Sequence, residues 1–305
     1  MAHSKYEIFL KTAETGNITR TAERLHYTQA GVSHAIAALE KETGFALFLR
    51  SSNGVELTEN GKRLLPAVQE LVNQQRNLEQ MIHEINGEVS GTLRVGIFSS
   101  VAIHRMPQIM REFQRRHPRV RFELRFGDYD TIAEDILHGR SDCGFLSAPA
   151  PENLCFYPLY QDSMQVLLPP RHPLAKKPYL TLAEVKREPL IMQRKGSDND
   201  MRRVLEQDKL PFTIRHLVND DFSVIAMVEN GFGITIMPEM IPASYKGIFE
   251  MRPLQPPQIR TIGIAGSAPA KTGLLTRTFI LFLTEENVQT RNAQTGGEKQ
   301  DSGSL

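Results

Sequence analysis

Residues 18–41 have the sequence ITRTAERLHYTQAGVSHAIAALEK, and this stretch decides how the amino-terminal part of the chain folds. Apolar residues recur at steps of four and three in two runs, first Ile18, Ala22 and Leu25, then Val32, Ile36 and Leu39. Residues at this spacing share one face of an α-helix, so each run predicts a short helix that buries a stripe. Only residues 26–28 separate the runs, and Thr28 is a good N-cap for the second helix. Two short helices joined by a tight corner indicate a helix-turn-helix, whose second helix enters the major groove of DNA.

The outward side of the second helix carries the candidate DNA-reading residues. Ala30 is small enough to let the helix approach base edges closely, and Gln29 suits a two-pronged hydrogen bond to adenine. Ser33 and His34 reach base acceptors or phosphates from the same side. For this stretch taken alone, an ordinary helical hairpin in a protein core is the alternative interpretation.

The next segment, residues 42–65, has the sequence ETGFALFLRSSNGVELTENGKRLL and predicts a β-hairpin. Asn53-Gly54 is a strong hairpin turn signal between strand-like residues. A hairpin behind a helix-turn-helix is a wing, and Arg50 at its base is well placed for a phosphate or the minor groove. Thr58 then caps a new helix. We also expect one compact apolar cluster from four residues: Phe45, Leu47, Phe48 and Leu49.

The run of residues 16–65 resembles the winged helix-turn-helix of LysR-type transcriptional regulators. That family typically shows G-S-x-x-x-A-A-x-x-L-x-x-[ST]-Q-x-[AT]-[VL]-S-x-x-I-x-x-L-E-x-x-[LV]-G-x-x-L-F-x-R, followed by a wing and L-T-x-x-G. The matching positions here are Gly16, Ala22, Leu25, Thr28, Gln29, Val32, Ser33, Ile36, Leu39, Glu40, Gly44, Leu47, Phe48, Arg50, Leu57, Thr58 and Gly61. The chain departs at Asn17, Thr21, Gly31 and Thr43, and it has Ala30 where Pro is common and His34 where Arg or Lys is common. The resemblance implies DNA contacts by Thr28, Gln29, Ala30, Ser33, His34, Arg50, Ser51 and Ser52.

Composition agrees with a small DNA-reading module attached to something larger. At 305 residues and 40% hydrophobic content, the chain is long enough for two or three domains. A net charge of +1 is too small for the protein to bind nucleic acid through its overall charge, so locally placed basic residues must provide the attraction. The chain has two cysteines, Cys143 and Cys155, which we expect to be reduced and packed, and it has no Cys/His pair at metal-ligand spacing. Neither a signal peptide nor an apolar stretch approaching about 18 residues is present, so we expect a cytoplasmic protein.

Residues 62–90 predict a linker helix that pairs with its copy in a second subunit. Steps of four and three give an a/d seam formed by Leu64, Val68, Leu71, Gln75, Leu78, Ile82 and Ile85. Gln75 would weaken packing within the seam but help to set its register. The alternative is a long helix packed on its own chain. A two-fold dimer suits a palindromic site with half-sites about one helical turn apart, or a multiple of it.

From residue 91 the pattern changes to alternating strands and helices, which predicts βαβ units and a mostly parallel sheet. The expected strands are residues 92–98, 120–126, 142–146, 164–168, 213–218, 234–238 and 259–265. The expected helices are residues 103–117, 129–137, 201–207, 222–229 and 272–285. The fold class is therefore α/β, with a winged helix-turn-helix at 1–61, a linker at 62–90 and an effector domain at 91–286. The effector domain divides into subdomain 1 (91–160 and 267–286) and subdomain 2 (161–266), joined near Tyr160 and Gly266, and residues 287–305 form a tail expected to be disordered.

This second part resembles the LysR-type effector domain, which has the fold of type 2 periplasmic binding proteins. The landmarks are GTLRVGIF, MPQIMREFQRRHP, ILHGRSDCGFL, VLLPPRHPLA and VENGFGITIMPE. In such sheets ligands bind beyond the carboxyl ends of strands and at helix N-termini. The effector-binding candidates are Ser99, Ser100, Asp128, Tyr129, Thr131, Ser197, Asp198, Asp220 and Phe222. Each loop alone is more often an ordinary helix cap, and only together, in this fold, do the loops favour a small-molecule cleft. The acids among them, with Asp130, argue against assuming an anionic effector.

The resemblance implies a transcriptional regulator that binds double-stranded DNA and a small-molecule effector, with no other cofactor. It also implies a homo-oligomer, dimer or tetramer, and contact with RNA polymerase. Effector binding would close or reorient the subdomains and so change DNA binding, to the extent of its differential affinity for the two states. Catalysis is not expected, because the chain has no G-x-S-x-G elbow, no G-x-x-x-x-G-K-[ST] loop and no metal constellation. The alternative is a winged-helix regulator that senses an oxyanion such as molybdate, which the two-lobed α/β pattern disfavours.

Overall fold

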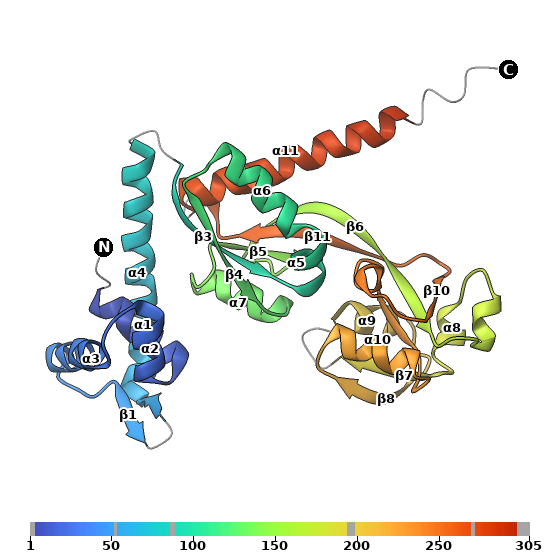
Figure 1. Ribbon diagram of the computed structural model, residues 1–305. Coiled ribbons are helices and arrows are strands. Elements are labelled where there is room, and N and C mark those ends of the chain that lie inside the picture. Colours follow the sequence, from blue (N-terminus) through green and yellow to red (C-terminus); the bar gives the residue numbers. More distant parts are fainter. Residues whose placement is uncertain (1–3, 52–53, 86–88, 194–198, 270–271, 298–305) are drawn as a thin grey trace. The chain divides into compact units, whose positions relative to one another are not determined.

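The computed structural model describes residues 4–51, 54–85, 89–193, 199–269 and 272–297 (Figure 1). The chain forms two compact units, one of residues 1–86 and 138–140 and the other of residues 87–137 and 141–305. None of the helices among the described residues is long and apolar enough to cross a membrane.

The first unit is a winged helix-turn-helix, as the sequence predicts. Its elements are α1 (Lys5–Thr15), α2 (Ile18–Leu25), α3 (Gln29–Thr43), β1 (Phe48–Ser51), β2 (Gly54–Leu57) and α4 (Glu59–Ile85). The corner between α2 and α3 is tight because His26 adopts a left-handed conformation, with φ of 57°. Phe9 of α1 is fully buried, and the apolar stripe Val32, Ile36 and Leu39 of α3 packs in the same core.

Two residues of the family pattern fix the wing to the end of α3. The Glu40 carboxylate accepts hydrogen bonds from the backbone N–H groups of Leu47 (2.7 Å) and Phe48 (3.2 Å). A Cβ added at Gly61 would lie 2.3 Å from the carbonyl oxygen of Leu47, so only glycine lets the first turn of α4 approach that backbone. The apolar cluster is smaller than expected: Leu47 and Phe48 are buried, whereas Phe45 and Leu49 are 38% and 60% exposed. Within β1, Leu49 points away from the face on which Phe48 is buried, because successive side chains of a strand point in opposite directions. Phe45 lies in the bend before the strand.

The predicted stripe of α4 divides into a buried half and an exposed half. Val68 is buried in the core of the winged module, together with Val72, which lies outside the predicted stripe. Further along, four members of the stripe are exposed by about half or more: Leu71, Leu78, Ile82 and Ile85. One subunit therefore leaves the distal half of this apolar stripe uncovered.

The second unit is built on a seven-stranded sheet whose order is β10-β6-β11-β5-β3-β4, with β9 pairing to β6, and on a two-stranded sheet of β7 and β8. The strands are β3 (Gly91–Ile97), β4 (Val120–Phe126), β5 (Cys143–Ser147), β6 (Cys155–Leu168), β7 (Pro189–Gln193), β8 (Thr213–Val218), β9 (Thr235–Pro238), β10 (Glu250–Pro253) and β11 (Ile259–Gly266). Strand β3 pairs in parallel with β4 and β5, and β7 pairs in parallel with β8. The remaining pairs are antiparallel.

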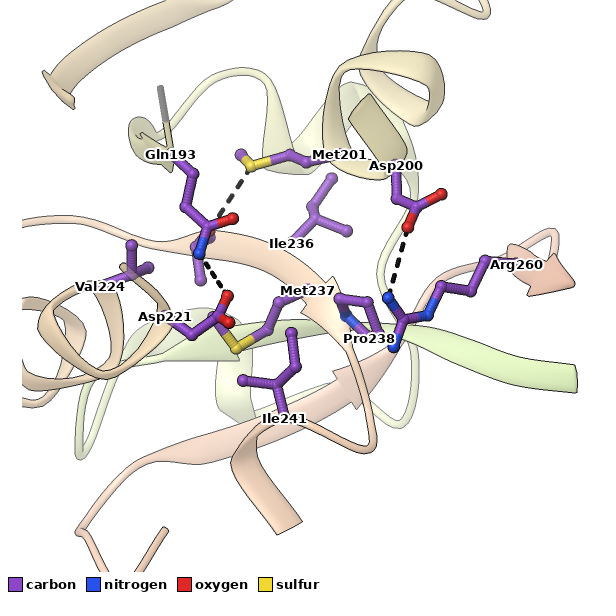
Figure 2. Close-up of a pocket in the computed structure, with 11 residues that line it drawn as sticks. Gln193, Asp200, Met201, Asp221, Val224, Ile236, Met237, Pro238, Ile241 and Arg260 are labelled. Atoms are coloured by element: carbon purple, nitrogen blue, oxygen red, sulfur yellow. Dashed lines mark hydrogen bonds and ion pairs between the residues drawn. The ribbon is translucent and has the colours of Figure 1, made fainter. Parts of the chain in front are cut away.

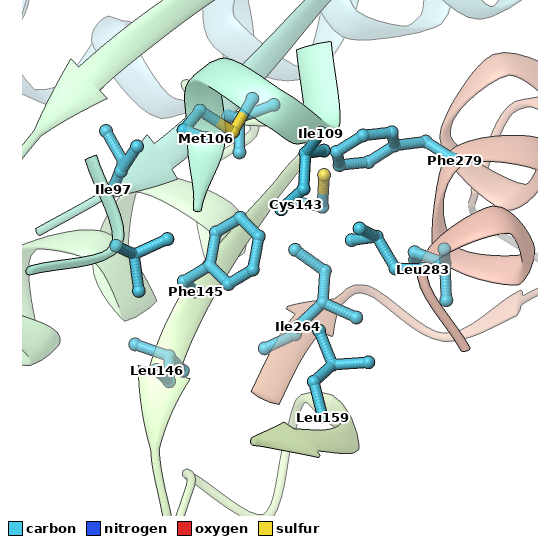
Figure 3. Packing of buried hydrophobic residues seen from close by; sticks show 14 of the residues in the cluster. Ile97, Met106, Ile109, Cys143, Phe145, Leu146, Leu159, Ile264, Phe279 and Leu283 are labelled. Atoms are coloured by element: carbon cyan, nitrogen blue, oxygen red, sulfur yellow. The ribbon is translucent and has the colours of Figure 1, made fainter. Parts of the chain in front are cut away.

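Helices cover these sheets and complete two hydrophobic cores. The helices are α5 (Ser99–His104), α6 (Met106–Arg116), α7 (Tyr129–Leu137), α8 (Leu182–Val185), α9 (Asn199–Leu205), α10 (Asp221–Glu229) and α11 (Leu274–Gly297), with short 3₁₀ turns at Pro173–Lys176 and Pro242–Ser244. In the first core, Phe145 of β5 packs among residues from α6 and α11, including Phe279 (Figure 3). The second core surrounds β6, β7 and β9, with Val166 and Leu190 fully buried.

Strand β6 joins the two subdomains. Its first part pairs with β11, and its last part, from Met164, pairs with β9 and β10. The crossing near Tyr160 lies on this strand, as expected. We expected the return crossing near Gly266, but it lies earlier in the chain. Ile259 of β11 already pairs with Ser163 of β6, and from Ile262 to Gly266 the strand pairs with β5 of subdomain 1. The return therefore falls at the start of β11.

Other elements also differ from the sequence prediction. The strand expected at residues 164–168 is the last part of the longer β6 (Cys155–Leu168). The helix expected at residues 103–117 breaks at Arg105, because Pro107 has no N–H and crowds the preceding turn. The last helix continues to Gly297, whereas we expected it to end at residue 285 and residues 287–305 to be disordered; residues 298–305 lie outside the described part. A nucleated helix adds one hydrogen bond per residue, so a proline-free polar segment extends it at little cost. The short strands β7 and β10 were not predicted.

Candidate nucleic-acid interface and effector cleft

The exposed face of α3 carries the predicted DNA-reading residues. Thr28 accepts a hydrogen bond from the backbone N–H of Gly31 at 3.0 Å, and so caps the helix as expected. Gln29, Ala30 and His34 are exposed and Ser33 is half-buried. The burial of the opposite stripe turns these residues outward, which leaves their polar groups available to a partner.

The wing supplies the second part of this interface. Arg50 lies in β1, opposite Val55 of β2, and its side chain is exposed. Within the described residues, Arg50 makes no ion pair. Ser51 is also exposed and pairs with Gly54, whereas the predicted contact Ser52 lies outside the described residues.

The effector domain holds a buried arginine where its two subdomains meet. Arg260, in β11, is 2% exposed, and Asp162 of β6 is 5% exposed. The Arg260 guanidinium donates to Asp162 Oδ2 from Nε (3.0 Å) and from Nη2 (2.7 Å). Nη2 also donates to Ser100 Oγ at 2.8 Å, and Nη1 donates to the Tyr129 hydroxyl at 2.9 Å and to Asp200 at 3.4 Å. All five N–H groups of this guanidinium therefore have an acceptor within the protein.

Both carboxylate oxygens of Asp200, on α9, likewise accept hydrogen bonds from within the protein. One oxygen accepts from the Tyr129 hydroxyl at 2.7 Å as well as from Arg260. The other accepts from the Ser147 hydroxyl at 3.0 Å and from Arg203 at 2.9 Å. Burial opposes the charge of Arg260, yet Tyr129, Asp162 and Asp200 hold its pKa above the usual value. We call these five residues, Ser100, Tyr129, Asp162, Asp200 and Arg260, the latch, because they join subdomain 1 to α9 of subdomain 2.

A pocket lies beside the latch on the subdomain 2 side (Figure 2). It contains about 380 Å³ of space, its open mouth included. The lining is mostly apolar, with five polar side chains, and consists of Gln193, Asp200, Met201, Asp221, Val224, Thr235, Ile236, Met237, Pro238, Ile241 and Arg260. A small concave site with a few convergent polar groups is typical of a small-molecule pocket.

Asp221 is the acid of this pocket that lies outside the latch. It opens α10, and its carboxylate accepts a hydrogen bond from the Gln193 side-chain amide. Burial raises the pKa of Asp221 above the usual range, although hydrogen bonding from Gln193 and the positive charge of Arg260 act in the opposite direction. Within the described residues, no Lys, Arg or His forms an ion pair with it.

The predicted effector residues fall into four groups. Ser100 and Tyr129 belong to the latch, and Ser99 lies near enough to Asp221 to lower the pKa of its carboxyl group. Asp128 and Asp220 instead cap helices: Asp128 accepts from the backbone N–H of Thr131 at 2.8 Å, and Asp220 from that of Ser223 at 2.9 Å. Phe222 is 43% exposed and stacks on Tyr245. Ser197 and Asp198 lie outside the described residues.

Sequence reasoning missed five functional candidates, namely Gln193, Asp200, Met201, Asp221 and Arg260. Asp221 is adjacent to the predicted Asp220, and helix-capping preference favours the earlier residue as the cap and leaves the next carboxylate free to face the pocket. Arg260 gave no local signal, because an arginine inside a strand pattern is usually an exposed residue.

The two cysteines lie in register on either side of one strand. Cys143 of β5 and Cys155 of β6 both pair with Gly266 of β11. Two strand spacings separate them by about 10 Å, which exceeds the reach of a disulfide. Burial raises the pKa of the Cys143 thiol well above its usual value. No group of three or more metal-ligating side chains occurs among the described residues.

Two family models match this chain. The model described as "Bacterial regulatory helix-turn-helix protein, lysR family" matches residues 3–62, and the model described as "LysR substrate binding domain" matches residues 86–287. The chain belongs to the LysR family of transcriptional regulators. It is thus a DNA-binding regulator with an effector-binding domain.

Known relatives of this LysR-type regulator cover almost its whole length. The transcriptional regulator YvbU of Bacillus subtilis, itself described as uncharacterized, is 29% identical over 93% of this chain and 98% of its own. A full-length variant of OxyR from Pseudomonas aeruginosa has a TM-score of 0.70 at 21% identity, with 93% of each chain covered. Full-length CbnR, solved in complex with its target DNA, has a TM-score of 0.54 at 19% identity, covering 93% of this chain and 98% of its own. These likenesses to solved structures show the fold.

Proposed function

We propose that a small molecule bound in the pocket beside the latch controls DNA binding by this LysR-type regulator. The observation that carries this proposal is the position of the pocket. It is lined by Arg260 and Asp200, which are the latch residues that connect β11 with α9, and by Asp221 at the start of α10. A ligand that contacts α9 and α10 therefore also contacts Asp200 and Arg260, which hold the subdomains together.

The mechanism is a shift between two arrangements of the subdomains. A ligand shifts such an equilibrium only by its differential affinity for the two states. Here the affinity differs between the two arrangements because residues of subdomain 2, including two latch residues, line the pocket. Ser99 of subdomain 1 lies near Asp221 in the same pocket. Movement of either subdomain changes the contacts of the ligand, so ligand binding changes the preferred arrangement.

On the DNA side, α3 enters the major groove and the wing contacts the backbone. Gln29, Ser33 and His34 are the base-reading candidates, and Thr28 and Ala30 lie where the helix comes closest to the DNA. Arg50 neutralises a phosphate and Ser51 hydrogen-bonds to one. The exposed half of the α4 stripe, Leu71, Leu78, Ile82 and Ile85, pairs with its copy to form a homodimer. A two-fold dimer then presents two copies of α3 to a palindromic site, and dimers associate further into a tetramer.

Three finer aspects complete the proposal. The regulator acts in the cytoplasm, where its DNA lies, and contacts RNA polymerase at the promoter. It does not catalyse a reaction, in keeping with relatives that are transcriptional regulators. It needs no cofactor beyond the effector.

The test is a fluorescence-anisotropy titration of the full-length protein with DNA from upstream of its own coding region, at two salt concentrations. A random duplex of equal length is the control. We expect tight binding to the upstream DNA and weaker, more salt-dependent binding to the random duplex. Candidate small molecules are then added to the specific complex. If no molecule that binds the effector domain alters DNA affinity, DNA bending or subunit arrangement, the proposed coupling is wrong.

A further inference from the structure

The class of the effector follows from which polar groups of the pocket already have partners, and this inference rests on the proposed function. Arg260 is the cation that lines the pocket. Each of its five N–H groups already donates to Asp162, Ser100, Tyr129 or Asp200. A carboxylate effector that sought this guanidinium would have to displace a buried acid and leave the charge of that acid without its cation.

Among the described side chains of the cleft, the acids are in excess over the cations. Asp162, Asp200 and Asp221 face the charges of Arg260 and Arg203, which leaves a formal charge of −1 among these side chains. Asp200 uses both oxygens within the latch and with Arg203 and Ser147. Asp162 bonds to Arg260 and to the backbone N–H of Met240. Asp221 has no ion-pair partner among the described residues: its carboxylate accepts a hydrogen bond from the Gln193 amide, and Ser99 and the charge of Arg260 act on it from nearby.

The rest of the pocket suits an apolar body. Val224, Ile236 and Ile241 contribute branched aliphatic walls, and Met201 and Met237 contribute adaptable thioethers. Figure 2 shows Met237 and Ile241 on the same side of the pocket as the Asp221 carboxylate.

We infer that the effector is a small organic amine, whose ammonium group pairs with Asp221 and whose apolar part lies against Met201, Met237 and the aliphatic wall. An ammonium donates three N–H bonds, so it satisfies the carboxylate and also reaches the Gln193 amide oxygen. A desolvated ammonium–carboxylate pair is favoured over an anionic ligand at this site, because the anion would meet Asp221 with its own charge.

The test uses matched probes that share a body and differ only in charge. Butyl, cyclohexyl and benzyl compounds are each supplied as the primary amine, the alcohol and the corresponding carboxylate. Binding to the full-length protein is measured by isothermal titration calorimetry at neutral pH. We expect saturable binding by an amine of at least one of the three bodies, with the matched alcohol and carboxylate at least tenfold weaker.

Variants locate the binding. Asp221→Asn keeps the shape of the side chain and removes its charge, and we expect it to weaken amine binding about tenfold to a hundredfold, as for loss of a hydrogen bond to a charged group. Glu152→Gln removes an exposed acid of the same domain that does not line the pocket, and we expect it to bind the amine as the wild type does. Circular dichroism melting of both variants checks that each is folded.

The outcomes separate this inference from the proposed function. Tighter binding by a carboxylate, binding by no amine of any body, or amine binding that Asp221→Asn leaves unchanged would each overturn the amine assignment. A carboxylate that binds and alters DNA affinity would overturn the assignment while supporting effector control. An amine that binds through Asp221 but leaves DNA affinity and bending unchanged would support the assignment and contradict the control.

Discussion

Arg50 and Arg260 carry the same guanidinium in opposite surroundings. Arg50 lies exposed on the wing, and within the described residues it has no ion-pair partner. Arg260 is 2% exposed and has an acceptor for every N–H group. An exposed arginine costs little to keep unpaired, because water solvates it until a phosphate replaces the water. A buried arginine has no water to solvate it, so the folded protein itself must supply its hydrogen-bond acceptors. The comparison indicates that the DNA interface is built for a partner to complete, whereas the latch is complete in itself.

The largest effect is expected at the latch. Arg260→Met leaves Asp162 and Asp200 buried without their cation, so we expect the effector domain to lose about 3–5 kcal/mol of unfolding free energy. Urea unfolding of the full-length protein, followed by circular dichroism, measures this loss. Arg50→Ala is the matched control and should change stability by less than about 0.5 kcal/mol. Similar stability for both variants would contradict the contrast between the two arginines.

A smaller effect is expected for base reading. Gln29→Ala removes an exposed amide at the start of α3, so it should cost about 1–3 kcal/mol on the specific DNA and little on random duplex. Anisotropy titrations with both duplexes give the two losses. Equal losses on both would mean that Gln29 contacts the backbone and not a base.

The third effect tests an exposed acid that, unlike Arg50, has partners within the chain. Asp220 caps α10, and bonds from the Ser223 hydroxyl and backbone N–H lower its pKa. Asp220→Ala should cost about 1 kcal/mol of stability at neutral pH, whereas Asp220→Asn keeps a capping oxygen and should cost less. Because the folded-state pKa is lowered, the ionic part of this stabilisation is present above the unfolded pKa of about 3.9 and is lost as pH falls through the folded value. Unfolding at several pH values should therefore show the cost of Asp220→Ala shrinking below about pH 4, and a cost that stays constant or grows there would contradict this role.

The smallest effect is expected for the wing. Arg50→Ala should weaken binding to specific and random DNA alike and reduce the slope of log affinity against log salt by about 1. Affinities measured at a series of salt concentrations give the slope. If binding weakens only on the specific duplex, Arg50 reads sequence and the backbone role is wrong.

The amino-terminal module was predictable from local sequence in most respects. The stripe of Val32, Ile36 and Leu39, the cap Thr28 and the strong Asn53-Gly54 turn signal each act within a few residues. The exposure of Phe45 and Leu49 was not predictable, because four apolar residues in a row do not say which of them meet the core.

In the effector domain the sequence placed most strands and helices, including residues 120–126, 129–137 and 213–218 with their observed bounds. It did not place the break at Arg105 or the short strands β7 and β10. Those two strands have four or five residues each, too few to show a period above chance.

What the sequence by itself determined is the family, the order of the elements and the outward face of α3, because periodicity and caps are local properties that the backbone imposes. What only the tertiary structure decided is the latch and the pocket. Arg260 lies 160 residues from Ser100 and 98 residues from Asp162 along the chain. Pairing of β11 with β6 brings Arg260 opposite Asp162, and the sheet order β11-β5-β3 brings it to Ser100 after β3. Whether an aspartate is a helix cap, as Asp220 is, or a pocket acid, as Asp221 is, depends on which neighbours fill its oxygens, and that is settled by packing.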